Sequence, residues 1–163
     1  MDRDHAVRTI RMYFGGAYAA LGLFALATYR GISASAQPAA EWQFAPEPLT
    51  IAACAFAAAG VAASLWLPRW LLAMGAQARK QGTVPLEPLD ASGKASLAAL
   101  TPLVALCLAL AEAPAIAGMV LAHAHHTMSP LWPFLAVSAV AFAVHWPTLD
   151  RLDAMARSLR GDL

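Results

Sequence analysis

The sequence predicts an all-α integral membrane protein, a four-helix bundle with both termini in the cytoplasm. Composition is the first observation: 60% of the 163 residues are hydrophobic and 13% are charged, whereas soluble domains are roughly 45–50% apolar and about 25% charged. Second, the apolar residues gather in four runs, and third, the basic residues gather on one side of these runs. Together they predict a single membrane domain over residues 1–163, with no length left for a sizeable soluble domain.

The four apolar runs give the expected spans, at residues 12–29, 49–67, 97–122 and 131–146. A helix needs about 20 residues to cross the hydrocarbon, with a range of roughly 17–25. The fourth run is at the short end of that range. Trp132 and Trp146 bracket it, as aromatic side chains at the two membrane interfaces do.

Basic residues set the expected orientation, because cytoplasmic loops carry an excess of Lys and Arg. They precede the first run, separate the second from the third and follow the fourth, at Arg3, Arg8, Arg11, Arg69, Arg79, Lys80, Lys94, Arg151, Arg157 and Arg160. Only Arg30 falls on the other side. This division predicts a multi-pass protein of the bacterial inner (cytoplasmic) membrane, surrounded by lipid.

A cleaved signal peptide is the competing interpretation of the first run. Ser33-Ala-Ser-Ala36 resembles the small-residue site after which such peptides are cut. However, residues 12–29 exceed the roughly 7–15 apolar residues of a signal peptide, and Arg30 interrupts the approach to the site. The pattern favours retention of this run over cleavage after Ala36.

The C-terminal segment 148–160 is expected to form a helix, because Leu149, Leu152, Met155 and Leu159 recur at helical spacing. Two placements suit this pattern equally. The helix lies on the membrane surface near anionic lipid, or it docks on the protein's own loops.

Small residues at every fourth position predict close helix packing, because they let the backbones of membrane helices approach one another. The third span carries Ala105, Ala109, Ala113 and Ala117, and the second carries Ala55, Ala59, Ala63 and Gly60. The simplest interpretation is a tight contact between the second and third spans, within one chain or between chains.

Glu112 is the candidate functional residue, because it is a lone carboxyl in the middle of the third run. A charge at that depth costs roughly 2.5–3.5 kcal/mol on insertion scales, so such residues usually face a protein interior and mark function. Pro114 removes one backbone hydrogen bond and leaves the Leu110 carbonyl without its usual partner. Glu112, Leu110 and Pro114 therefore form a candidate site for H⁺ or Na⁺. The alternative is an internal hydrogen bond that ties helices together.

The segment Leu110-Ala-Glu-Ala-Pro-Ala-Ile-Ala-Gly-Met-Val-Leu-Ala122 resembles the ion-binding helix of subunit c, the rotor-ring proteolipid of rotary ATP synthases. By this resemblance Glu112 matches the family's carboxylate and Gly118 its downstream glycine, which implies that Glu112 binds H⁺ or Na⁺. The sequence Ala-Arg-Lys-Gln at 78–81 is similar to the family's cytoplasmic loop. The second span lacks the family's glycine run, and two further spans flank the hairpin, so an ordinary rotor subunit is not expected.

The chain also resembles a group of small, uncharacterised bacterial four-span membrane proteins. The residues that carry this resemblance are Ala109-Leu-Ala-Glu-Ala-Pro-Ala115 and Pro147-Thr-Leu-Asp-Arg151. It implies the four-span fold and supplies no activity.

His123, His125 and His126 cluster at the outer end of the third span and are weak candidates for a Zn or Cu site or for pH sensing. A zinc site needs about four ligands in fixed geometry, and no carboxylate or cysteine at ligand spacing accompanies them. An interfacial polar loop is the simpler interpretation. Cys54 and Cys107 form no CxxC pair, and no cofactor is expected.

Three functions fit these patterns, in decreasing order of weight. The protein is a structural or accessory subunit or a homo-oligomer with Glu112 as a buried polar tie, an ion-handling protein that uses Glu112, or a metal-responsive protein that uses the outer histidines. No nucleophile elbow, phosphate loop or metalloprotease motif appears, so an enzyme is not expected. The net charge of +1 comes from segregated charges, which argues against nucleic-acid binding.

Overall fold

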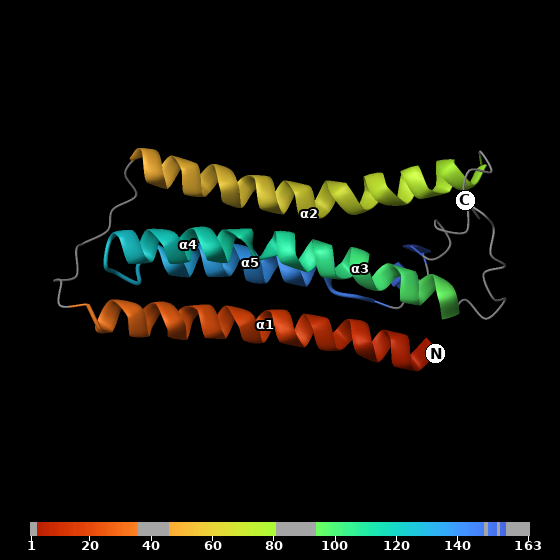
Figure 1. Cartoon of the computed structure of the whole chain (residues 1–163), viewed down its shortest axis with the longest axis horizontal. Helices are drawn as coiled ribbons and strands as arrows, with labels where there is room; N and C mark the ends of the chain where they lie inside the picture. Colours follow the sequence, from red (N-terminus) through yellow and green to blue (C-terminus); the bar gives the residue numbers. More distant parts are fainter. Residues whose placement is uncertain (1–2, 36–45, 81–93, 149, 153, 156–163) are drawn as a thin grey trace.

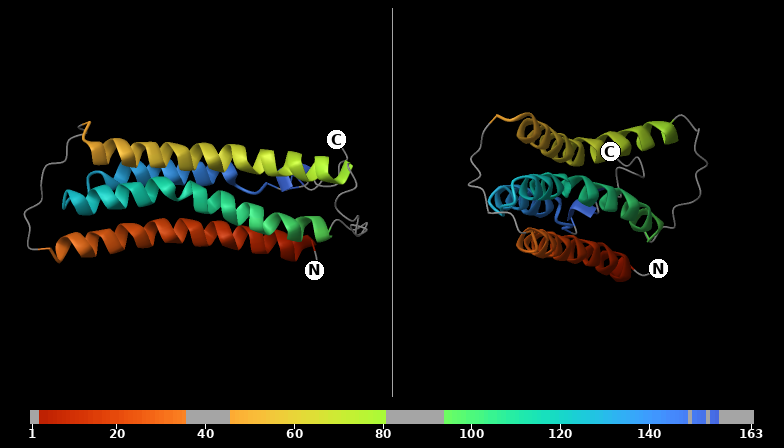
Figure 2. Two further views of the ribbon diagram at one scale, coloured as in Figure 1. Left: turned by 45° about the horizontal axis from the view of Figure 1, so that its top comes forward. Right: turned by 60° about the vertical axis from the view of Figure 1, so that its left-hand side comes forward.

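The fold is a bundle of helices, described in a computed structural model for residues 3–35, 46–80, 94–148, 150–152 and 154–155. Within these ranges every regular element is helical, so the all-α prediction is confirmed. The elements are α1 (Arg3–Ser33), α2 (Pro48–Lys80), α3 (Lys94–Ala111), α4 (Ala113–Ala124) and α5 (Leu131–His145). The first two lie on opposite sides of the rod formed by α3 and α4, and α5 runs beside α4 (Figure 1, Figure 2).

Three stretches are long and apolar enough to cross a membrane, namely Arg8–Ser33, Pro48–Gly75 and Leu100–Ala124. The last of them joins α3 to α4. The apolar helix α5 is shorter, with 15 residues, or about 22 Å at roughly 1.5 Å per residue. Large apolar side chains such as Met12 and Val140 point outward, as they do on helices surrounded by lipid. The chain therefore has the helix lengths and the surface of a membrane protein.

The packed core joins α1 to α3 and α5. Ile10, Phe14 and Phe142 are buried there. Edge-to-face aromatic contacts extend it: the ring centroids of Phe14 and Trp146 are 5.5 Å apart, and those of Tyr18 and Phe142 are 5.4 Å apart. Such pairs contribute about 0.5–1.5 kcal/mol beyond the area they bury, and they fix α1 against the end of α5.

Two glycines allow helices to approach backbone to backbone. A Cβ atom at Gly60 of α2 would overlap with Cβ of Ala113 and would lie 2.9 Å from the carbonyl oxygen of Leu110. A Cβ atom at Gly118 of α4 would lie 2.7 Å from Cβ of Phe134 in α5. Because glycine lacks a side chain, α2 and α5 each pack against the rod of α3 and α4 at van der Waals distance.

The buried face of α2 is offset from the small-residue row expected from the sequence. Its buried small residues are Ala53, Ala57, Gly60 and Ser64, whereas Ala55 and Ala59 are exposed and Ala63 is half-buried. A strict four-residue spacing advances about 40° per step on a helix with roughly 3.6 residues per turn. The expected row therefore winds away from α4, while a spacing of four and three residues stays on one face.

The alanine row of the third span divides between two environments. Ala113 and Ala117 are buried, as a helix contact requires, whereas Ala105 is half-buried and Ala109 is exposed. The contact with α2 thus uses the second half of the row, and the first half is left on another surface.

The C-terminal segment docks on the bundle in its described part. Leu152 is 2% exposed and belongs to the same cluster as Ile10 and Phe14, and Met155 packs against that cluster. Docking is thus the placement found for residues 150–152 and 154–155, on the helical core and not on loops. Residues 149, 153 and 156–160 of the expected helix lie outside the described residues.

Replacing Gly60 with alanine tests the close approach of α2. The added methyl group meets backbone and has no room to move, so we expect Gly60→Ala to lower the free energy of unfolding by about 1–3 kcal/mol. Gly22→Ala is the matched control, because no atom lies within 4 Å of a Cβ placed there. It should stabilise α1 by up to about 1 kcal/mol through helix propensity. Thermal unfolding in detergent, followed by circular dichroism, measures both. Equal effects of the two substitutions would contradict this packing.

Candidate functional site

Glu112 lies between α3 and α4, at the midpoint of the stretch Leu100–Ala124. The helical path continues through it: its N–H donates to the Leu108 carbonyl at 3.0 Å, and its carbonyl accepts from the Ile116 N–H at 3.2 Å. Its side chain makes no capping hydrogen bond to the start of α4. The backbone therefore holds Glu112 halfway along this stretch, and its carboxyl is left available on the side of the rod.

Glu112 lines a groove between α1 and α3 with a volume of ≈ 700 Å³. The groove extends toward the ends where α1 and α3 begin, and its other lining residues are Thr9, Met12, Tyr13, Gly16, Ala17, Ala105, Leu108 and Ala109. Most of its lining is apolar or small. In the described part of the chain, no hydrogen bond or ion pair reaches the Glu112 carboxyl.

The structure does not bring the three residues of the expected ion site together. The Leu110 carbonyl faces Gly60 on α2, whereas the Glu112 side chain faces the groove beside α1, and the two helices lie on opposite sides of the rod (Figure 1). Pro114 is buried and contributes the break in the helix. Glu112 alone of the three lines the groove, because helical positions two apart point to nearly opposite sides, whereas positions 110 and 114, four apart, share a face.

Ser138 of α5 supports the break at Pro114. Its Oγ accepts a hydrogen bond from the N–H of Ala115 at 3.0 Å, and its side chain is fully buried. The bond compensates for irregular backbone pairing next to the proline. Sequence reasoning missed this residue. The signal for it is that a lone serine stands within an otherwise apolar run.

A second polar cluster, also missed from the sequence, lies at the end of α5. The Nε2 atom of His145 is 3.1 Å from Oγ of Ser64, which itself donates to the Val61 carbonyl at 2.8 Å. The imidazole N–H is thus the donor to Ser64. The guanidinium of Arg151 donates to the Val144 carbonyl at the same end of α5. Ser64 and His145 are 81 positions apart in sequence, so their pairing depends on the tertiary arrangement.

The outer histidines diverge. The His123 ring lies over Gly31 of α1, with Nδ1 2.9 Å from the Met119 carbonyl. Nε2 of His125 lies 3.9 Å from a carboxylate oxygen of Glu47, just before α2. Within the described ranges, no three His, Cys, Asp or Glu side chains gather as metal ligands would.

Comparison of the chain with protein-family models, curated proteins and solved structures found no match. The two resemblances seen in the sequence stay predictions.

His126, the second residue after the end of α4, has a backbone conformation that favours glycine. Its φ is 50°, in the left-handed region, which costs a residue with a side chain roughly 1–2 kcal/mol. The His126 N–H bonds to the His123 carbonyl at 3.4 Å, and the Thr127 N–H bonds to the Ala122 carbonyl at 3.1 Å. These are the two bonds of a Schellman cap, which sets up the short turn into α5.

Substituting His126 with glycine should remove that strain. We expect His126→Gly to raise the free energy of unfolding by about 0.5–1 kcal/mol, because the larger entropy of unfolded glycine offsets part of the gain. Ala124→Gly, at the last residue of α4, is the control and should lower stability by up to about 1 kcal/mol. Thermal unfolding compares them. If both glycines destabilise the protein alike, the cap is not formed as described.

Proposed function

We propose that the bundle spans a bacterial inner membrane four times, with both termini in the cytoplasm, and acts as a structural or accessory membrane subunit. In this proposal it self-associates through the groove between α1 and α3. Glu112 forms a hydrogen bond across that contact and ties the two copies together.

The observation that carries this proposal is the Glu112 carboxyl, which lies halfway along a membrane-length stretch with no partner among the described residues. A polar group left unsatisfied in hydrocarbon costs several kcal/mol. A two-fold pairing brings the same face of both copies together. A protonated carboxyl carries both a donor and an acceptor, so two facing Glu112 side chains would satisfy one another.

The groove walls support the same conclusion. Gly16 and Ala17 on α1 and Ala105 and Ala109 on α3 line it, and small residues are the ones that admit a neighbouring membrane helix. Ala105 and Ala109 do not serve the internal contact with α2. An intermolecular contact would give this half of the alanine row a role.

Substitutions at Glu112 test the polar tie. Interhelical hydrogen bonds in membranes contribute about 0.6–2 kcal/mol, so Glu112→Leu should weaken self-association about 3- to 30-fold. Glu112→Gln should retain it, since an amide also donates and accepts. Sedimentation equilibrium in detergent gives the association constants. A wild-type protein that stays monomeric at all concentrations would overturn the proposal.

Filling the groove tests its role independently of the carboxyl. Ala109→Leu adds bulk to the groove wall and should abolish association. Ala55→Leu is its control, because Ala55 is exposed on α2 and lies outside the groove. Loss of association in both variants, or in neither, would count against this surface.

A second candidate function is proton binding at Glu112, which one observation favours. The groove leads from Glu112 past the hydroxyl groups of Tyr13 and Thr9 toward the end where α1 begins, and these two hydroxyls could relay a proton to the carboxyl. Because the Leu110 carbonyl faces α2, few oxygens are left to replace the water around Na⁺. The geometry thus favours H⁺ over Na⁺.

Labelling with dicyclohexylcarbodiimide, which modifies protonated carboxyls in apolar surroundings, tests proton binding. We expect Glu112 to be labelled at neutral pH, and labelling to slow as pH rises because the reactive protonated form is lost. Glu112→Gln is the unlabelled control. Protection by Na⁺ would instead indicate an alkali-cation site. Labelling that is independent of both pH and Na⁺, with equal proton flux in vesicles of wild type and Glu112→Gln, would remove ion handling.

A further inference from the structure

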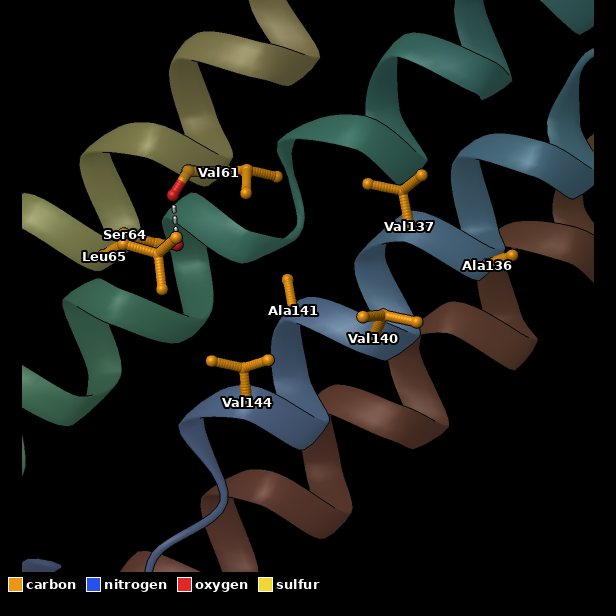
Figure 3. Close-up of a pocket in the computed structure, with 8 residues that line it drawn as sticks. All are labelled: Val61, Ser64, Leu65, Ala136, Val137, Val140, Ala141 and Val144. Carbon is orange, nitrogen blue, oxygen red and sulfur yellow. Dashed lines mark hydrogen bonds between the residues drawn. The ribbon is translucent and has the colours of Figure 1, made fainter.

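A second groove lies between α2 and α5, away from Glu112. It is apolar, with a volume of ≈ 300 Å³, and its walls include Val61, Ser64 and Leu65 on α2 and Val137, Val140 and Val144 on α5. Figure 3 shows the valines of α5 facing the side chains of α2 across the groove. Val140 is 64% exposed, so the groove opens onto the outer surface of the bundle.

One end of this groove carries polar and basic side chains. Val144 is the last lining residue on α5, and its carbonyl accepts from the Arg151 guanidinium. Ser64 and His145 pair at the same end. Arg69 follows Leu65 by four residues and therefore lies one turn further along the same face of α2. In the described part of the chain neither arginine forms an ion pair.

Aromatic residues place this charged end at a membrane interface. Trp66 and Trp70 stack on α2 with ring centroids 5.8 Å apart, and both are exposed, as is Trp146 after α5. Tryptophans concentrate where hydrocarbon meets lipid headgroups. The groove thus runs inward from headgroup depth. From Ala136 to Val144 it follows α5 for about 12 Å, close to the roughly 15 Å that one leaflet contributes to the hydrocarbon core.

We propose that this groove binds an anionic phospholipid. One acyl chain lies between α2 and α5, and the phosphate sits on Arg151 and Arg69. Charge complementarity selects the headgroup, because a guanidinium has five N–H donors in a fixed fork that matches phosphate oxygens. Arg151 uses one of its Nη nitrogens on the Val144 carbonyl, so its other N–H donors remain for the phosphate. The site shares no residue with the α1/α3 groove, so it requires membrane insertion but not self-association.

Lipid binding to the purified full chain, measured by native mass spectrometry, tests this site. The probes are dioleoyl phosphatidylglycerol and dioleoyl phosphatidylcholine, which share their acyl chains and differ in net charge. We expect tighter binding of phosphatidylglycerol. Arg151→Gln and Arg69→Gln should each reduce that preference about fivefold, since a basic residue near anionic lipid contributes about 1 kcal/mol. Arg30→Gln is the control: Arg30 lies in the last turn of α1, at the opposite end of the bundle from Arg69 and Arg151, so the preference for phosphatidylglycerol should be unchanged.

Filling the groove tests the acyl-chain half of the proposal. Ala136→Leu narrows the groove and should weaken binding of both lipids, whereas Ala27→Leu, on an exposed face of α1, should not. Equal affinity for the two lipids, or a preference retained by both arginine variants, would overturn the site and leave Arg151 as a cap of α5. Displacement of the lipid by soluble glycerol phosphate would overturn the role of the acyl chain. If Arg151→Gln fails to fold because α5 loses its cap, Arg69→Gln decides the headgroup contact.

Discussion

The close approach of α2 to the rod at Gly60 is the contact on which the arrangement of the bundle depends. Pro114 leaves the Leu110 carbonyl without its helical donor, and the side-chain-free surface at Gly60 packs directly against that carbonyl and against Ala113. Glu112 lies two positions after Leu110 on the helix, so its side chain points to the other side of the rod and lines the groove beside α1. Two polar groups near the break therefore lie on opposite sides of the rod: the Leu110 carbonyl, which α2 covers, and the Glu112 carboxyl, which faces the groove beside α1.

The elements of the fold were largely predictable, and their contacts were less so. The apolar runs predicted the helices, but α1 and α2 continue beyond residues 29 and 67 to Ser33 and Lys80, because helix formation does not stop where hydrophobicity does. Pro114 indicated the break near Glu112. Within the chain, the small-residue contact on α2 leaves Ala55 and Ala59 exposed, since a spacing of four residues drifts around a helix that repeats about every 3.6 residues.

The candidate sites divide in the same way. Glu112 stands out in the sequence because a single carboxyl in an apolar run has a high cost. The residues of α1 that line the groove with it cannot be identified from the sequence, because no local pattern links position 112 with positions 9–17. The same holds for Ser138 with Ala115 and for Ser64 with His145. These pairings join residues 23 and 81 positions apart, and they arise only once the helices are packed.

The short length of α5 has a consequence for the surrounding bilayer. In the four-span arrangement proposed above, a helix of about 22 Å faces a hydrocarbon layer of about 30 Å. Such hydrophobic mismatch is relieved when the bilayer becomes thinner beside the helix, or when polar side chains at the helix ends extend outward to the headgroups. The local thinning of the bilayer would occur next to α5. It would not occur around α2, which is long enough to span the hydrocarbon layer. The protein would then partition toward thinner membranes and respond to lipid chain length along one flank.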